Sequence, residues 1–583
     1  MDLKLVFSRT TRWGAAATAA VTAAAMCAPA ASAQAVTSDG ASAPHAGVVS
    51  TTSGFSSKKW GDPATDSISK DTYGKHQAAK DPGSLYTVEK AIGARSLWAD
   101  TDESGRQLTG QGVSVAVLDS GVSPVAGLDS AGKVTYGPDL SIESNGVLTQ
   151  QDTFGHGTFM AGIIAGRGAT NPSSDLSKAP ANVQLGVAPD AGLLAMKLAT
   201  TDGSTDVSQV IAALDWVTQH AVLPDGTRVR VINLSYGTDS AQAYLADPLA
   251  AAAENAWKHG IVVVTSAGNG GPDSGRLTDP AIDPYLIAVG ATDSNAKVNG
   301  WAASRATVAS FSSVGSAERH VDLVAPGTSL VSSRTPGSFI DVNNPSGLVS
   351  GDASGDLFRG SGTSEAAAVV SGSVALLLQA YPDLTPDQVK YALTSSADPV
   401  ANATETAGGA GTLDLTEAIK VAKKLTKTGK NAADQRAAAI QDFPSSTGQG
   451  SIDATRAGSV LVDAAGNDLT GEIDVQGNTW DAAAWWQATS NVSAWSGGQW
   501  LGVTWTGDDW QPASGDLSSS RWSSSRWSSS RWSTADWESS RWSSSRWSSS
   551  RWSSSRWSSS RWSDNGWDSS RWSSSRWSSA DWS

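Results

Sequence analysis

Three short segments of this chain carry side chains that together could turn a serine hydroxyl into a nucleophile. Asp119 ends an apolar run and precedes Ser-Gly, His156 lies between two glycines, and Ser364 follows Gly-Thr. A serine hydroxyl is a weak nucleophile at neutral pH, so it needs a base to take its proton. A third group, commonly a carboxylate, orients that base. The three residues therefore indicate acid–base-activated nucleophilic chemistry.

Each of these segments also has a simpler interpretation. Asp119 could belong to a surface turn, and Ser364 could be only the N-cap of the Ala-rich helix expected over 366–379. At a helix N-terminus, however, unpaired backbone N–H groups favour a developing negative charge beside the hydroxyl. The glycines beside His156 let the backbone approach closely, and they let the small-residue helix expected over 159–166 pack tightly.

A fourth segment adds a hydrogen-bond donor. Asn269 follows Ala-Gly just after the strand expected over 261–266. Its amide could donate to an oxyanion, jointly with the backbone N–H of Ser364. The alternative role for Asn269 is that of a turn residue.

The elements that must position these residues alternate along the chain. Apolar runs and helical periodicity predict strands over 113–118, 229–234 and 261–266, and helices over 206–220 and 245–259. This alternation predicts an α/β fold with a mostly parallel central sheet covered on both faces. In such sheets the chemistry lies beyond the carboxyl ends of the strands, where Asp119 and the loop with Asn269 both fall.

The charge is unevenly distributed along the 583 residues. The net charge is −14, but from Leu517 onward ten Arg stand against five acidic residues, which gives +5 there and −19 in the rest. An acidic body argues against nucleic acid as its ligand.

The first 33 residues have the pattern of a secretory signal. Three basic residues precede an Ala-rich apolar run over 13–28, and Ala-Ser-Ala33 suits cleavage after Ala33. A membrane anchor is the alternative, although the run is short for one. The single cysteine, Cys27, lies in this segment, so the mature protein is expected to have no disulfide.

Several further motifs, in a fixed order along the chain, make the sequence resemble the subtilisin-like (subtilase, S8) serine proteases. Besides the four segments above, the resemblance rests on Gly186-Val-Ala-Pro189, Asn233-Leu-Ser-Tyr-Gly237 and Ala325-Pro-Gly327. It extends from about Tyr86 to Leu425, and it implies a three-layer α/β fold that hydrolyses peptide bonds in a protein or peptide substrate.

The resemblance also implies a role for each candidate residue. Ser364 would attack the peptide carbonyl, His156 would carry the proton and Asp119 would orient His156. Asn269 would hold the oxyanion. Extended substrate would bind along Ser235, Tyr236, Gly237, Ala267 and Gly268. Because such pairing recognises the substrate backbone, broad specificity is expected.

The sequence departs from the family pattern just after the serine. Relatives usually have Met-Ala there and a Pro three residues after the Met, whereas this chain has Glu365-Ala366 and Ala368. Loss of the Pro could relax the helix start, and the carboxyl of Glu365 could raise the pKa of His156 or raise the reaction barrier. The alternative to an exported endopeptidase is therefore an impaired pseudo-protease that binds peptides or serves as a cell-envelope adhesion module.

Two further polar segments are given non-catalytic interpretations. Asp152, shortly before His156, is expected to be a solvated loop acid, with a position facing the substrate cleft as the alternative. Relatives commonly bind calcium in the loop before Gly-Val-Ala-Pro. In this chain that loop, 177–183, lacks evident side-chain ligands, so no metal and no cofactor are expected.

The C-terminal region is dominated by tryptophan. Twenty of the 26 Trp follow Thr479, and from Trp522 to Trp582 one recurs every fifth residue, mostly as Ser-Ser-Ser-Arg-Trp. A period of five fits neither a helix face nor a strand face, so a mostly disordered tail is expected. Its Arg-Trp pairs could hold the enzyme at the cell surface by contacting envelope polymers, membrane headgroups or another protein, or the tail is a passive spacer.

These observations predict five segments. They are a signal peptide over 1–33, a flexible extension or short pro-segment over 34–85, a subtilisin-like catalytic domain over 86–425, a linker with a small segment over 426–478, and the Trp-rich low-complexity tail over 479–583.

Overall fold

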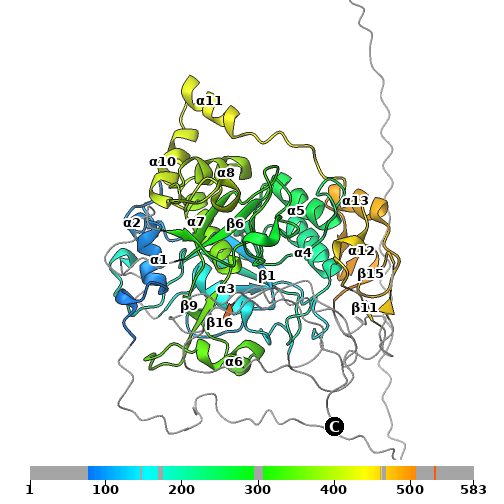
Figure 1. Ribbon diagram of the computed structural model, residues 1–583, viewed down its shortest axis with the longest axis horizontal. Helices are drawn as coiled ribbons and strands as arrows, with labels where there is room; N and C mark the ends of the chain where they lie inside the picture. Colours follow the sequence, from blue (N-terminus) through cyan, green and yellow to red (C-terminus); the bar gives the residue numbers. More distant parts are fainter. Residues whose placement is uncertain are drawn as a thin grey trace, which may run out of the picture. The chain divides into compact units, whose positions relative to one another are not determined.

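A mainly parallel sheet runs through the centre of the fold (Figure 1). Its strand order is β2 (Val134–Tyr136), β3 (Gly192–Lys197), β1 (Val113–Asp119), β4 (Arg228–Leu234), β5 (Val262–Ser266), β6 (Ile287–Asp293) and β7 (Thr307–Val308), with β8 (Leu323–Pro326) also paired to β6. Strand β7 pairs antiparallel with β6, and the other pairings in this sheet are parallel. The predicted α/β fold is confirmed.

The computed structural model describes residues 76–144, 148–168, 175–293, 306–459, 461–462, 468–469, 471–506 and 531–532. All of them belong to one unit, Lys70–Ser583. The predicted signal segment and most of the predicted tail lie outside the described residues.

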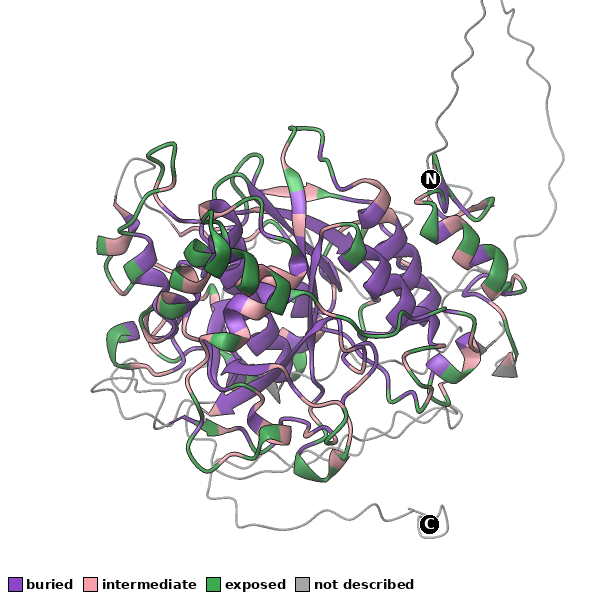
Figure 2. Ribbon diagram, turned by 90° about the horizontal axis from the view of Figure 1, so that it is seen from above, coloured by how far each residue is buried: buried purple, intermediate pink, exposed green. Residues whose placement is uncertain are grey.

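The helices lie on both sides of the sheet, and Figure 2 shows the buried strands between them. On one side α3 and α7 pack against each other and against the sheet, and on the other α4 and α5 form a second contacting pair. The helices are α1 (Leu85–Ala91), α2 (Ala94–Leu97), α3 (His156–Ala165), α4 (Val207–Gln219), α5 (Pro248–Lys258), α6 (Phe339–Asn343), α7 (Thr363–Ala380), α8 (Pro386–Ser395), α9 (Glu405–Gly408), α10 (Leu415–Leu425), α11 (Lys430–Ala439), α12 (Ile452–Thr455) and α13 (Ala482–Ser490).

Smaller sheets complete the described structure. One has the order β16 (Arg531–Trp532), β10 (Leu357–Ser361) and β9 (Leu330–Ser333), and the others are β11 (Leu461–Val462) with β12 (Asp468–Leu469), and β13 (Trp495–Ser496), β14 (Gln499–Trp500) and β15 (Val503–Thr504).

Burial explains the residues of the central strands and of helix α7. Strand β1 is buried along its whole length, as expected for a parallel sheet with both faces covered. Helix α7 is long and apolar enough to cross a membrane by length and composition, but 94% of it is buried inside the fold. It is therefore the central core helix, packed against β1, β4, β5 and β6.

The described structure begins at His76, before the expected start of the catalytic domain at Tyr86. His76 Nε2 lies 2.9 Å from the Asp81 carboxylate, and the same carboxylate accepts a 2.5 Å hydrogen bond from Arg359 on β10. The end of the predicted N-terminal extension is thus attached to the strand that leads to Ser364.

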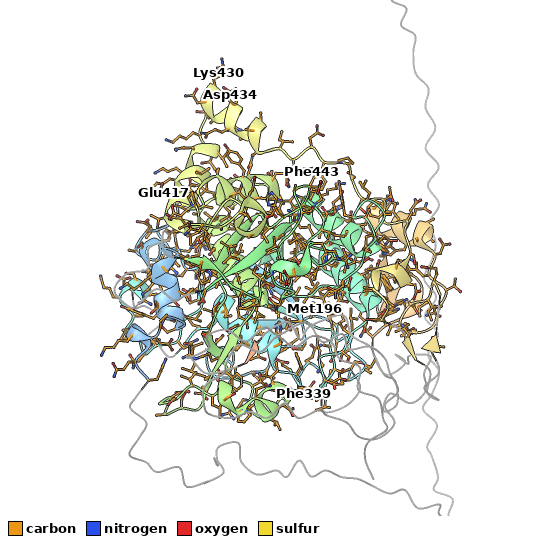
Figure 3. The ribbon with its side chains drawn as sticks, in the orientation of Figure 1. Met196, Phe339, Glu417, Lys430, Asp434 and Phe443 are labelled. Atoms are coloured by element: carbon orange, nitrogen blue, oxygen red, sulfur yellow. The ribbon has the colours of Figure 1, made fainter. Side chains whose placement is uncertain are left out.

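The region after Leu425 also differs from its expectation. The predicted linker contains helix α11, and Figure 3 shows its residues Lys430 and Asp434 at the outer end of that helix. Residues 479–506, expected to belong to a disordered tail, form α13 and the β13–β15 sheet.

The tryptophans of this C-terminal part pack onto helix α4. Trp485 and Trp500 both donate their indole N–H to Asp215 Oδ2, at 3.0 and 2.9 Å, and Thr489 donates to Asp215 Oδ1 at 2.6 Å. Trp495 donates to the backbone oxygen of Ala212 at 2.8 Å. Buried polar groups on α4, rather than a helical or strand periodicity, position these indoles.

Asp215 is an uncommon anchor because its hydrogen-bond donors are neutral. Burial raises its pKa to about 6, although Thr489, Trp500 and Trp485 oppose the rise. The folded protein therefore keeps this proton up to about pH 6, whereas the unfolded chain releases it near 3.8. Stability must fall as the pH rises between these two values, and the lost stability is not regained above them.

Replacing Asp215 by Asn is expected to stabilise the protein at about pH 8 and not at about pH 4. The amide oxygen of Asn can accept both indole N–H groups without burying a charge. The difference between the folded and unfolded pKa values of Asp215 corresponds to a charge-burial cost of roughly 3 kcal/mol at most. Urea unfolding followed by tryptophan fluorescence at both pH values measures this difference. An equal loss of stability at both would show that Asp215 is held as a well-paired anion.

Candidate active site

The carboxyl ends of three adjacent parallel strands bring the predicted residues together. Asp119 is the last residue of β1, Ser235 follows β4 directly, and Ala267 follows β5 directly. Because β1, β4 and β5 are neighbours in the sheet, these residues lie along one edge.

Asp119 and His156 form a fully buried pair. His156 Nδ1 lies 2.8 Å from Asp119 Oδ1 and 2.9 Å from Oδ2, and neither side chain is exposed to solvent. Asp119 Oδ1 also accepts the backbone N–H of Ser120 at 2.7 Å. The carboxylate therefore fixes the ring orientation, with Nδ1 turned toward β1.

Charge around the imidazole favours its protonated form. Burial alone would lower the pKa of His156, but Asp119, through its charge and hydrogen bond, and the charges of Glu365 and Asp152 outweigh that effect and raise it. Burial also raises the pKa of Asp119, while the charge and hydrogen bond of His156 oppose the rise.

Ser364 lies in the first turn of α7 and is buried. Its hydroxyl donates to the backbone oxygen of Ser235 at 3.5 Å, and the Ser235 hydroxyl donates to the backbone oxygen of Ser364 at 3.2 Å. Helix α7 packs against α3, whose first residue is His156. The serine and the histidine thus occupy the first turns of two contacting helices.

Asn269 is held beside the same helix start. Its Oδ1 accepts the backbone N–H of Thr363 at 2.9 Å and the Thr363 hydroxyl at 3.0 Å. Because the amide oxygen faces these two donors, the NH₂ group of Asn269 points away from Thr363 and can donate to another acceptor. The Thr363 hydroxyl also accepts the N–H of Gly268 at 3.2 Å. Thr363 is not among the functional residues predicted from the sequence, although its position between Gly362 and Ser364 is a signal for it.

The predicted substrate-binding positions directly follow the neighbouring strands β4 and β5. Tyr236 and Ala267 are fully buried, so their side chains are part of the core. A Cβ atom at Gly237 would lie 2.5 Å from Thr278 Oγ1, and one at Gly268 would lie 2.7 Å from Thr278 Cγ2. Both glycines are therefore required by the close approach of Thr278.

Two expectations about individual residues need correction. Asp152 is 2% exposed and is therefore not a solvated loop acid. Its carboxylate turns inward because the backbone N–H groups of Gly155 and Thr158 need an acceptor there. Ala368 does not relax the helix start, because α7 is regular from Thr363 onward and Ala368 is buried within it. Glu365 is buried as well, in the first turn of α7.

Within the part of the chain that the structure describes, no group of three or more His, Cys, Asp or Glu side chains has a geometry suited to a metal ion.

Comparisons with known proteins identify a family and several relatives of this chain. Residues 110–434, more than half of the chain, match the Subtilase family (Peptidase_S8). Serine protease AprX of Bacillus subtilis (strain 168) is 35% identical over 321 residues, which cover 54% of this chain and 68% of that protein. Subtilisin Savinase of Lederbergia lenta is 33% identical over 292 residues, which cover 50% of this chain and 86% of that protein. The solved structure of Sphericase is 26% identical, covers 56% of this chain and 98% of its own, and superposes with a TM-score of 0.42.

The fold and the family match define a serine endopeptidase of the subtilisin-like class. The chain belongs to the subtilase family, and its substrates are proteins or peptides.

Replacing Glu365 by Gln is expected to lower the pKa of His156, because it removes one of the negative charges that favour the imidazolium. Histidine-selective NMR titration measures this pKa, with the signal assigned by its absence from His156→Ala. Glu417→Gln, an exposed change of the same charge on α10, is the matched control and should leave the titration unchanged. A higher pKa in Glu365→Gln would contradict the assignment of this charge.

Proposed function

We propose that Ser364, His156 and Asp119 form the catalytic triad of this endopeptidase. His156 takes the proton of the Ser364 hydroxyl as that oxygen attacks the peptide carbonyl, and it later gives the proton to the leaving amine. Asp119 holds the ring tautomer and stabilises the imidazolium. The observation that carries the proposal is the buried Asp119–His156 pair at the start of α3, which packs against the helix that begins at Thr363.

We further propose that the NH₂ group of Asn269 and the backbone N–H of Ser364 stabilise the oxyanion. The contact of Asn269 Oδ1 with Thr363 supports this, because it fixes the amide orientation before substrate binds. Preorganised donors act on the transition state without reorganisation at the moment of reaction. Extended substrate would lie along residues 235–237 and 267–268, which follow adjacent strands.

Export is proposed from the signal pattern of the first 33 residues, with cleavage after Ala33. The Arg-Trp repeats of the tail are the proposed contact with an anionic polymer or membrane surface of the cell envelope.

Replacing Ser364 by Ala is expected to lower the rate of casein hydrolysis by a factor of at least about 10⁴ relative to the wild-type protein. The nucleophile is lost, while substrate binding and the oxyanion donors remain. Casein and peptide-library digestion by wild-type and variant protein measure activity and cleavage preference together. Equal activity of the two proteins would exclude Ser364 as nucleophile, whereas an inactive wild-type protein would favour a peptide-binding pseudo-protease.

Replacing Asn269 by Leu is expected to lower kcat by about 10²–10³ with little change in KM, a magnitude established on subtilisin itself. The donor acts on the developing oxyanion and not on the ground-state carbonyl. Steady-state kinetics with a short chromogenic peptide separate the two constants. A rise in KM with unchanged kcat would assign Asn269 to substrate binding instead.

A further inference from the structure

The buried carboxylate of Asp152 has three hydrogen-bond donors, and all of them flank the Asp119–His156 pair. Its Oδ1 accepts the Ser120 hydroxyl at 2.8 Å and the backbone N–H of Gly155 at 2.6 Å. Its Oδ2 accepts the backbone N–H of Thr158 at 2.7 Å. A carboxylate buried to this degree needs such donors, and the site provides them from both sides of His156.

The first of these sides is the start of helix α3. Its N-cap, Gly155, has no side chain to accept the helix's unpaired N–H groups, and its φ of +105° suits glycine. The caps come from outside the helix: Ser120 Oγ accepts the N–H of Gly157 at 3.0 Å, and Asp152 accepts that of Thr158. Asp152 and Ser120 therefore fix the backbone on which His156 is mounted.

The second contact of Asp152 is with the Ser120 hydroxyl. This hydroxyl has one proton to donate, and two carboxylates lie within hydrogen-bond distance of it. Asp152 Oδ1 is 2.8 Å away and Asp119 Oδ1 is 3.2 Å away, so the proton points to Asp152. Asp119 Oδ1 then accepts mainly from the Ser120 N–H and from His156. A carboxylate that receives fewer donors is more basic, so it holds the imidazole proton more strongly.

We propose that Asp152 is a positioning residue for His156, acting through the Ser120 hydroxyl and through the first turn of α3. The proposal rests on the proposed role of His156 as general base. In this proposal Asp152 contacts neither the substrate nor the reacting atoms. It holds the His156 ring and the Asp119 carboxylate in the positions that they need relative to Ser364.

The charge of Asp152 gives this role a signature in the pH profile. The carboxylates that act on the imidazole are Asp119 from β1, Glu365 from α7 and Asp152 from the turn before α3. Each of the three favours the imidazolium, so neutralising Asp152 lowers the pKa of His156. Since the neutral imidazole is the active form, the acid limb of kcat/KM moves to lower pH.

The test compares Asp152→Asn, Ser120→Ala and the double variant by steady-state kinetics on a short peptide across about pH 5 to 9. Asp152→Asn should lower kcat by about ten- to a hundredfold, because small misplacements of a catalytic group have effects of this size. KM should stay within about twofold, and the acid limb should move to lower pH. Ser120→Ala should lower kcat while leaving the acid limb near its wild-type position, because the charge of Asp152 remains.

Because the two residues act on His156 as one unit, the double variant should be hardly slower than Asp152→Asn alone. Asp474→Asn is the matched control: Asp474 is also buried and accepts the backbone N–H groups of Gln476 and Asn478, but far along the chain from the site. It should change thermal stability alone. Ser120→Ala keeps both carboxylates and the bond from Asp152 to Thr158, so it tests the proposal even if Asp152→Asn fails to fold.

Two results would overturn the proposal: Asp152→Asn with wild-type kcat and acid limb, and losses of activity that multiply independently in the double variant. Failure of the proposed function itself is recognised separately, since Ser364→Ala would then retain wild-type activity.

Discussion

The site depends on one energetically costly feature, the complete burial of the Asp119 carboxylate beside the His156 imidazole. A buried charge is tolerated where hydrogen bonds and an opposite charge compensate it. Asp119 is therefore placed at the end of β1, where the Ser120 N–H and His156 Nδ1 both reach it. The parallel sheet fixes one partner, and the start of α3 fixes the other.

Much of the scaffold around this pair could be predicted from the sequence. Strands β1 and β5 are largely apolar and fully buried, and β4 is buried from Val231 to Leu234, because both faces of the sheet are covered there. Helix α4 combines a periodic apolar face with a capping box at Asp206, and it begins and ends within one residue of its prediction. Apolar runs, helical periodicity and caps are set by neighbouring residues, so these elements could be predicted from the sequence alone.

The parts that could not be predicted depend on partners far away in the chain. Helices α3 and α7 both begin three residues earlier than expected, because residues distant in the sequence accept N–H groups of their first turns: Ser120 for α3 and Asn269 for α7. The polarity of Asp152 indicated solvent, but one of its donors, the Ser120 hydroxyl, is distant in the sequence, and the backbone N–H groups of Gly155 and Thr158 reach it only in the folded loop. The order in residues 479–506 was missed for a similar reason, since their indoles bind to acceptors on α4.

We propose that the buried pair activates Ser364, and the pH dependence of the reaction of Ser364 with a fluorophosphonate tests this claim most directly. The claim predicts a single adduct on the peptide that contains Ser364, formed at a rate that rises through an apparent pKa above the ordinary value of His, about 6.5. A folded protein that forms no adduct at Ser364, or forms it at a rate independent of pH, would contradict the claim.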